Sequence, residues 1–280
     1  MLHFEETTGT FYLENDEITY AFTVENGLPE HLWFGARIPR DDLRYTRWIS
    51  GTSCDAQLPG RTSENHIAAE LPTYGRGDFR EPMLGVRDEN GNALLALTYK
   101  GYRVIPEPRL AGLPSTFGGE TLEVTFEDAE KGLRAVLLYT LFADTAALTR
   151  SVRLENIGGH TLTLERAFSF AFDLPAGDYE ALTLAGSWAA ECAPERTPLR
   201  HGIFTVNSKR VTSSATQNPF LAVMTAGADE AHGDVYGVNL VYSSSYRLLA
   251  ETAQHGRVRV AGGINDFGFT WELRPGDTFQ

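Results

Sequence analysis

The stretch Leu122-Glu123-Val124-Thr125-Phe126-Glu127 alternates apolar and polar side chains with a period of two. Successive side chains of a β-strand point to opposite faces of the sheet, so this pattern predicts a strand with one buried face. The alternation recurs at 152–155 and 168–172. The apolar run 133–142 contains valine, tyrosine and threonine, which favour a buried strand over a helix. No long stretch has helical periodicity, so we expect an all-β chain.

Pairs of turn-forming residues separate these runs. They are Asn26-Gly27, Asn90-Gly91, Gly158-Gly159, Gly177-Asp178, His255-Gly256 and Pro275-Gly276. Such pairs commonly close β-hairpins, and hairpins in series build antiparallel sheets. A chain of 280 residues has a suitable length for an all-β sandwich that folds as one unit. We therefore expect residues 1–280 to form a single domain, a large sandwich of two packed antiparallel sheets.

The composition limits the partners and the compartment. A formal net charge of -13 without clusters of Lys and Arg argues against a surface for nucleic acid or an anionic membrane. The N-terminus lacks the features of a signal peptide, and no apolar run reaches the roughly 18 residues of a membrane span.

Cys54 and Cys192 lie far apart in the sequence, in neither a CxxC motif nor a zinc-ligand spacing. This usage fits a reduced, cytoplasmic setting, with one disulfide between the two cysteines as the alternative. No histidine pair has metal-ligand spacing, and we expect neither a metal nor a cofactor.

The longest stretch without strand patterning runs from Ser50 to Gly77. Loops longer than about 12 to 15 residues are usually functional or disordered. This one contains Cys54, Asp55, Arg61, Glu64, Asn65, His66 and Tyr74. It is therefore the first place where we expect a site.

The segment Tyr74-Gly75-Arg76-Gly77-Asp78-Phe79-Arg80-Glu81-Pro82 combines two glycines, an acid-base pair and an aromatic residue. Both glycines can adopt positive φ or allow another backbone to come close. Asp78 and Arg80 are two residues apart and share a face if the backbone is extended. They form either a structural pair that holds the loop or a polar contact with a sugar or a catalytic domain. For Asp78 we favour the structural pair.

This segment resembles the Gly-Asp-Phe-Arg region of the non-catalytic N-terminal domain of glycoside hydrolase family 36, whose best-known members are α-galactosidases. Further similar blocks follow in the same order, at 186–188, 191–196, 213–222, 232–243, 262–265, 269–273 and 275–276. Two departures occur. The stretch after Trp188 is looser than the Arg-Glu-Arg of the family, and Ser243-Ser244-Ser245 stands where Ser-Gly-Asn is common.

The resemblance implies a β-supersandwich that carries no catalytic residue, because the catalytic aspartates of this family belong to a (β/α)8 barrel, expected here after residue 280. It also implies that the full-length protein is a hydrolase, a glycosidase acting on terminal α-galactosides such as melibiose and raffinose. The partners would be the barrel of the same polypeptide, α-galactoside sugars and, in a homo-oligomer, further copies of the chain.

Bacterial members of the family are commonly tetramers in which a loop of this domain reaches a neighbour's active site. The matching loop here is Ser50 to Tyr74. In it we expect Asp55 to accept hydrogen bonds from sugar hydroxyls, and Arg61 to donate them or to brace the loop. Interdomain or loop-structural roles are expected for Asp78, Phe79, Arg80 and Trp188.

Two other functions stay open. A free-standing carbohydrate-binding or scaffold module would use the same polar-aromatic loops. A mutarotase-like sugar isomerase, whose family also uses a large β-sandwich, would need a general acid and a general base in one pocket. The local candidates for that pair are His66 with Glu64 or Glu70, and His232 with Glu230. As a domain of an α-galactosidase, the isolated chain should instead hydrolyse no galactoside and should self-associate through surface meant for partners.

Overall fold

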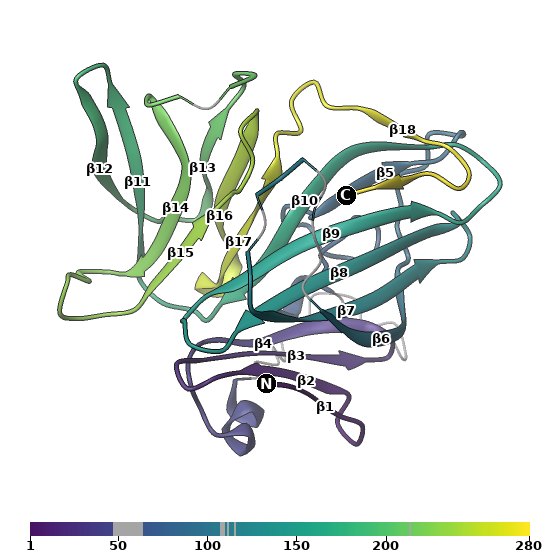
Figure 1. The fold of residues 1–280 in the computed structure, drawn as a ribbon, viewed down its shortest axis with the longest axis horizontal. Helices are drawn as coiled ribbons and strands as arrows, with labels where there is room; N and C mark the ends of the chain where they lie inside the picture. Colours follow the sequence, from purple (N-terminus) through teal and green to yellow (C-terminus); the bar gives the residue numbers. More distant parts are fainter. Residues whose placement is uncertain (47–63, 107–109, 111, 115, 213) are drawn as a thin grey trace. The chain divides into compact units, whose positions relative to one another are not determined.

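The computed structural model describes residues 1–46, 64–106, 110, 112–114, 116–212 and 214–280. Within these residues the chain forms strands and short 3-10 helices, and none of them lies in an α-helix (Figure 1). The sheets are mostly antiparallel, and an isolated parallel bridge joins Thr73 to Leu84. The prediction of an all-β, antiparallel chain is therefore confirmed.

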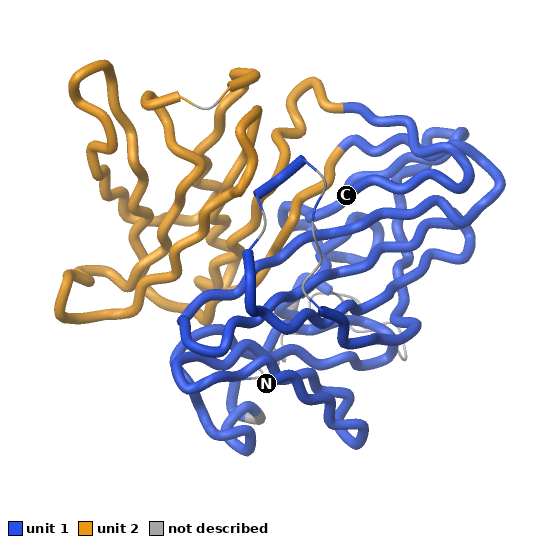
Figure 2. Tube along the Cα trace, viewed as in Figure 1, with its two compact units in different colours: residues 1–165, 270–280 blue, residues 166–269 orange. Residues whose placement is uncertain are grey.

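Two compact units make up the chain. Unit 1 comprises Met1–Glu165 and Thr270–Gln280, and unit 2 comprises Arg166–Phe269 (Figure 2). The boundary between them falls inside strand β10 (Leu162–Leu174). The first residues of β10 pair with β18 (Trp271–Leu273) in unit 1, and the later ones pair with β17 (Val258–Ile264) in unit 2.

Unit 1 is built from two antiparallel sheets in which hairpins follow one another along the chain. The first sheet has the order β1 (Leu2–Glu5), β2 (Thr10–Glu14), β3 (Ile18–Glu25), β4 (Leu28–Ala36). The second has the order β19 (Thr278–Phe279), β9 (Leu148–Asn156), β8 (Leu133–Phe142), β7 (Gly119–Asp128), β6 (Thr98–Pro106). The short strand β5 (Leu84–Arg87) pairs with β10, and the helices η1 (Arg40–Tyr45) and η2 (Glu64–His66) precede it.

Aromatic side chains join the two sheets of unit 1. The ring of Phe22 on β3 stacks on Tyr139 of β8, with centroids 5.2 Å apart, and Phe11 of β2 meets Tyr102 of β6 edge-on at 5.1 Å. Removing the buried rings of Phe11, Phe22 and Tyr139 from water contributes about 1.5–3 kcal/mol each. The opposite face of β7 carries Glu123, whose buried carboxylate accepts hydrogen bonds from arginines on β6 and β9.

Unit 2 contains a four-stranded sheet in the order β12 (Ala190–Pro198), β11 (Tyr179–Ser187), β14 (Gln217–Thr225), β15 (Val235–Asn239). Its other strands are β13 (Gly202–Ser208), β16 (Tyr246–Thr252), β17 and the later part of β10, in that order. The helix η3 (Gln254–Gly256) lies in the β16–β17 turn. The core is lined by apolar residues of these strands, such as Phe168, Leu221 and Leu248.

The predicted turn pairs all lie between strands, but two of the six close a hairpin. Asn26-Gly27 connects β3 to β4 and His255-Gly256 connects β16 to β17, and all four residues have positive φ. The pairs at 90–91, 158–159, 177–178 and 275–276 instead connect strands that belong to different sheets or do not pair with each other. A turn signal marks a reversal of the chain, while the pairing partner is decided by longer-range packing.

Gly263 illustrates how closely two strands approach in unit 2. A Cβ added there would lie 2.6 Å from the Cα of Phe168 on β10, beside the register shift between β10 and β17. We therefore expect Gly263→Ala to lower the free energy of unfolding by about 1–3 kcal/mol. Urea unfolding monitored by circular dichroism would measure this change in unfolding free energy.

The matched control is Gly237→Ala on β15 of the same unit. There the nearest atom to an added Cβ is 3.7 Å away, an ordinary contact. Equal stability of the two variants would contradict the steric explanation.

Candidate functional site

The segment from Glu64 to Pro82 in unit 1 lies beside strand β4 and contains most of the residues expected at the site. The N–H of His31 donates to the carbonyl of Ala68 (2.6 Å), and the N–H of Glu70 donates to the carbonyl of Pro29 (3.2 Å). These bonds join a strand-poor segment to the edge of the first sheet. Asp55 and Arg61 lie outside the described residues.

The two glycines of the segment adopt the backbone conformations expected for them. Gly75 has φ 116° and Gly77 has φ 86°. A Cβ at Gly75 would lie 2.9 Å from Cδ2 of Leu94, so the residue combines positive φ with a close approach. The prediction for these two glycines is therefore confirmed.

Asp78 and Arg80 form a buried pair that closes the segment on itself. Nε of Arg80 donates to Oδ1 of Asp78 (2.8 Å), and its Nη2 donates to Oδ2 of the same carboxylate (3.0 Å). Nη2 also donates to the carbonyl oxygens of Glu64 (2.9 Å) and Ile67 (2.8 Å). One guanidinium thus ties the beginning of the segment to its end, which is the geometry of a structural brace.

The aromatic residues singled out by the sequence lie on the surface of their units. Phe79, between the two braced residues, is 81% exposed, and Trp188 at the tip of the β11–β12 hairpin is 93% exposed. The brace therefore holds a fixed loop from which Phe79 projects. Interdomain roles for Phe79 and Trp188 stay predictions.

The described part of the chain offers little support for an isomerase pair. His232 is exposed, and its Nδ1 contacts Oδ1 of Asp229 at 3.1 Å rather than Glu230. Glu70 is completely buried, and both of its carboxylate oxygens are already bonded, Oε1 to the hydroxyl of Tyr20 and Oε2 to Nδ1 of His31. The side chain of His66 lies outside the described part.

Glu70 is the centre of a buried polar network that sequence reasoning did not foresee. Its Oε1 accepts hydrogen bonds from the hydroxyls of Tyr20 (2.5 Å) and Tyr139 (2.8 Å) and lies 2.8 Å from Nη1 of Arg150. Its Oε2 lies 3.0 Å from Nδ1 of His31. The five residues come from β3, β4, β8, β9 and the Glu64–Pro82 segment, which this network fastens to both sheets of unit 1.

The charges of the network favour an ionised carboxylate. Burial alone would raise the pKa of Glu70, but Arg150, His31 and Tyr20 together outweigh it and hold the pKa below its ordinary value. Burial raises the pKa of the Tyr20 and Tyr139 hydroxyls well above the usual range, so both remain neutral donors. A saturated carboxylate with a lowered pKa is a poor general base, and its role is to hold the segment in place.

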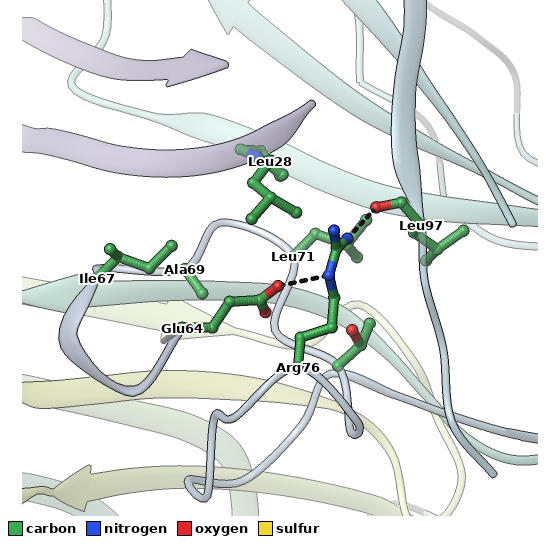
Figure 3. Close-up of a pocket in the computed structure, with 9 residues that line it drawn as sticks. Leu28, Glu64, Ile67, Ala69, Leu71, Arg76 and Leu97 are labelled. Atoms are coloured by element: carbon green, nitrogen blue, oxygen red, sulfur yellow. Dashed lines mark hydrogen bonds and ion pairs between the residues drawn. The ribbon is translucent and has the colours of Figure 1, made fainter. Parts of the chain in front are cut away.

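A small pocket lies between the segment and the neighbouring strands (Figure 3). Its apolar lining includes Leu28, Ile67 and Leu71, and Arg76 extends along it from an ion pair with Glu64 (Nε to Oε1, 3.0 Å) to the carbonyl of Leu97 (2.7 Å). Its volume of about 10 Å³ is roughly what one water molecule needs. A sugar would not fit in it.

Two kinds of feature are missing from the residues that the structure describes. Among them, no group of three or more His, Cys, Asp and Glu side chains is arranged to hold a metal ion. The same residues include no helix with the length and apolar character needed to cross a membrane.

Comparisons with known proteins give the same family as the motifs. The family model of the glycosyl hydrolase family 36 N-terminal domain matches residues 27–274. The α-galactosidase AgaA of Geobacillus stearothermophilus is 39% identical over 98% of this chain and 39% of its own length. α-Galactosidase 1 of Pediococcus pentosaceus is 37% identical over 99% of this chain and 39% of its own length.

Solved structures agree with the sequence comparisons. The α-galactosidase AgaB of Geobacillus stearothermophilus has a TM-score of 0.91 and 35% identity, covering 100% of this chain and 39% of that protein. A variant of AgaA in complex with raffinose has a TM-score of 0.90 and 38% identity, covering 96% of this chain and 39% of that protein. The chain thus spans 39% of the length of these relatives. It belongs to the family of glycoside hydrolase family 36 N-terminal domains.

Proposed function

We propose that this chain acts as the non-catalytic N-terminal domain of an α-galactosidase that hydrolyses terminal α-galactosides such as melibiose and raffinose. The observation that carries the proposal is the match of residues 27–274 to the family's N-terminal domain, in a chain that aligns with 39% of the relatives' length. In this proposal units 1 and 2 together form one domain, a β-supersandwich of two large sheets over residues 1–280. A catalytic (β/α)8 barrel follows it in the enzyme.

The chemistry of the proposed enzyme divides between the barrel and this domain. Retaining glycosidases use two carboxylates about 5–5.5 Å apart, one as nucleophile and one as acid and base. We assign both to the barrel. This domain supports the barrel and the assembly of a cytoplasmic homo-oligomer, and its loop Ser50 to Tyr74 contacts the sugar through Asp55 and Arg61.

The Glu64–Pro82 segment gives this loop a fixed base. The buried pair of Asp78 and Arg80 and the carboxylate of Glu70 hold the segment against the sheets of unit 1. A loop that starts from an anchored base loses less conformational entropy on binding a ligand than a free one. This is the part that the described residues would play in substrate binding.

Release of galactose tests the proposal. The isolated chain should release none from melibiose or raffinose, because no positioned nucleophile and acid are available to lower the barrier. A fusion of this chain to the part of AgaA that follows its matched region should release galactose. AgaA truncated to that same following part should lose activity or assembly.

A truncated AgaA with full activity and unchanged assembly would refute the supporting role. Galactose release by the isolated chain that is abolished by mutating one of its acidic residues would refute the non-catalytic assignment. Calorimetry separates the alternative of a free-standing sugar-binding module. Millimolar or tighter binding of galactose or raffinose to the isolated chain would favour that module over a domain whose site the barrel completes.

A further inference from the structure

Four chain connections of unit 2 lie at the same end of its sheets. They are the β11–β12 tip at 188–189, the β13–β14 connection at 209–212 and 214–216, the β15–β16 connection at 240–245, and residues 265–269 after β17. The strand registers place them together, because Ala185 near the end of β11 pairs with Gln217 at the start of β14, and Tyr246 at the start of β16 pairs with both Ser208 and Ile264. The hydroxyl of Tyr246 also donates to the carbonyl of Asn218 on β14. Figure 1 shows the first two of these connections at the upper end of the unit. We call the four connections the upper loop end.

Each of the four connections carries one exposed large apolar side chain. These are Trp188 (93% exposed), Val211 (83%), Val241 (53%) and Phe267 (69%). The connections at the opposite end of unit 2, at 175–178, 199–201, 226–234 and 253–257, are all described and carry no exposed large apolar residue within them. The exposed apolar residues nearest to them, Ile203 (48%) and Val235 (53%), lie in strands β13 and β15. Exposed apolar side chains gathered on one part of a surface mark an interaction site.

Hydrogen bonds fix the connection that displays Phe267. The buried amide of Asn265 donates to the carbonyls of Ser208 and Tyr246, both at 3.0 Å, and its Oδ1 accepts the N–H of Phe267 at 3.0 Å. The ammonium of Lys209 lies 4.0 Å from the centre of the Phe267 ring. The loop therefore needs little further ordering on binding, which favours affinity.

The tip that displays Trp188 is held in a similar way. The N–H of Ala189 donates to Oε1 of Glu191 (3.0 Å). A Cβ on Gly186 would lie 2.6 Å from the carbonyl oxygen of Ala190 and 2.9 Å from that of Ala215, so glycine is required where two of the connections meet. Large aromatic side chains on fixed loops are typical of the residues that dominate binding energy at interfaces.

The charge of the upper loop end is opposite to that of the whole chain. Its connections contain Lys209 and Arg210, both exposed, and the acidic residue Asp266, on a chain with a net charge of -13. Glu191 follows the tip on β12, where its carboxylate accepts the N–H of Ala189. Asp266 is bound by Arg166 (Nε to Oδ2, 2.9 Å) and by Arg247 (Nη1 to Oδ2, 3.1 Å), so its charge is neutralised locally. A partner for this surface would be apolar with an acidic margin.

We propose that the upper loop end is the surface on which the catalytic portion of the enzyme docks, with Trp188 and Phe267 as its anchors. This inference rests on the proposed function and adds the surface through which the domain contacts the catalytic portion. The occupant follows from two observations. Most of each relative has no counterpart in this chain, since the match covers 39% of it. A second copy of this chain placed on the same surface would bring Lys209 and Arg210 against their own equivalents, which is unfavourable.

Hydroxyl-radical footprinting with mass spectrometry tests the surface directly. The two samples are the isolated chain and its fusion to the part of AgaA that follows the matched region, with activity on raffinose recorded for the fusion. Oxidation of Trp188 and Phe267 should slow roughly tenfold in the fusion, as the core of an interface excludes water. His232, exposed at the opposite end of unit 2, should react equally in both samples.

A pair of variants adds a second readout. The double variant Trp188→Ala/Phe267→Ala should lower the temperature at which the fusion loses half its activity. It should not change the unfolding midpoint of the isolated chain. The matched control is Val235→Ala, which truncates an exposed apolar residue at the opposite end and should change neither.

Four results would overturn the surface assignment. An active fusion in which Trp188 reacts as fast as in the isolated chain would leave the proposed function standing and show that the catalytic portion docks elsewhere. Protection in the isolated chain that grows with its concentration would identify a second copy as the occupant. Protection that requires added raffinose would identify a sugar site. An inactive fusion without protection would contradict both the docking surface and the proposed function.

Discussion

Replacing Glu70 with glutamine is expected to lower the free energy of unfolding of this chain by about 3–5 kcal/mol, the usual cost of removing one partner from a buried ion pair. The carboxylate is fully buried and faces Arg150, whose side chain is 8% exposed. Glutamine keeps the size of the side chain but removes the negative charge that compensates this guanidinium. It also places an amide nitrogen, a donor, among groups that themselves donate.

The pH dependence of the Glu70→Gln effect follows from linkage. The pKa of Glu70 is lowered in the folded chain from its ordinary value of 4.5, because Arg150, His31 and Tyr20 outweigh the effect of burial. Its contribution to stability is therefore complete above the unfolded pKa and is lost as the pH falls through the lower folded pKa. The difference in unfolding free energy between wild type and variant should be largest near neutral pH and should shrink below about pH 4.5.

Urea unfolding at several pH values measures this difference. Glu89→Gln is the matched control, because this carboxylate is exposed and its contact is with the exposed His160. A Glu70→Gln chain as stable as the control, or a difference that grows on acidification, would show that the network does not fasten the segment.

Local features of the fold were open to prediction from sequence because they depend on neighbouring residues. The alternation at Leu122–Glu127 lies in β7, and the apolar run 133–142 coincides with β8. Gly75 and Gly77 adopt the positive φ that their place in the motif suggested. The blocks shared with glycoside hydrolase family 36 identified the family, because they recur in order along most of the chain.

Features that depend on strand pairing could not be read from the sequence. Glu70 meets Tyr20, Tyr139 and Arg150 only after hairpins far apart in the chain pack together, and no spacing between these residues signals the contact. The same reason explains why most of the turn pairs join different sheets instead of closing hairpins. The solvent exposure of individual aromatic residues could not be read from the sequence either. Of the aromatics, Trp188 and Phe79 carry no sequence mark that separates a surface residue from a core residue.

Replacing Arg80 with methionine should have an effect of similar size, about 3–5 kcal/mol of unfolding free energy. The change removes a guanidinium that is hydrogen-bonded to both oxygens of the buried Asp78 and to the carbonyls of Glu64 and Ile67. Methionine fills a comparable volume but donates no hydrogen bond, so the lost stability reports the polar contacts rather than a cavity. Lysine at this position should recover only part of it, because a single ammonium cannot reproduce the planar fork.

Two comparisons make the Arg80 prediction decisive. Arg37→Met removes a partner from an ion pair whose side chains are 56% and 98% exposed, and it should cost no more than about 1 kcal/mol. Adding Asp78→Asn to Arg80→Met should restore part of the stability, because the buried negative charge that lost its guanidinium is then removed as well. If the double variant were less stable than Arg80→Met by the full cost of Asp78→Asn alone, the two side chains would be energetically independent. The buried pair could then not be what holds the base of the loop from Ser50 to Tyr74, and its anchoring would have to come from the Glu70 network alone.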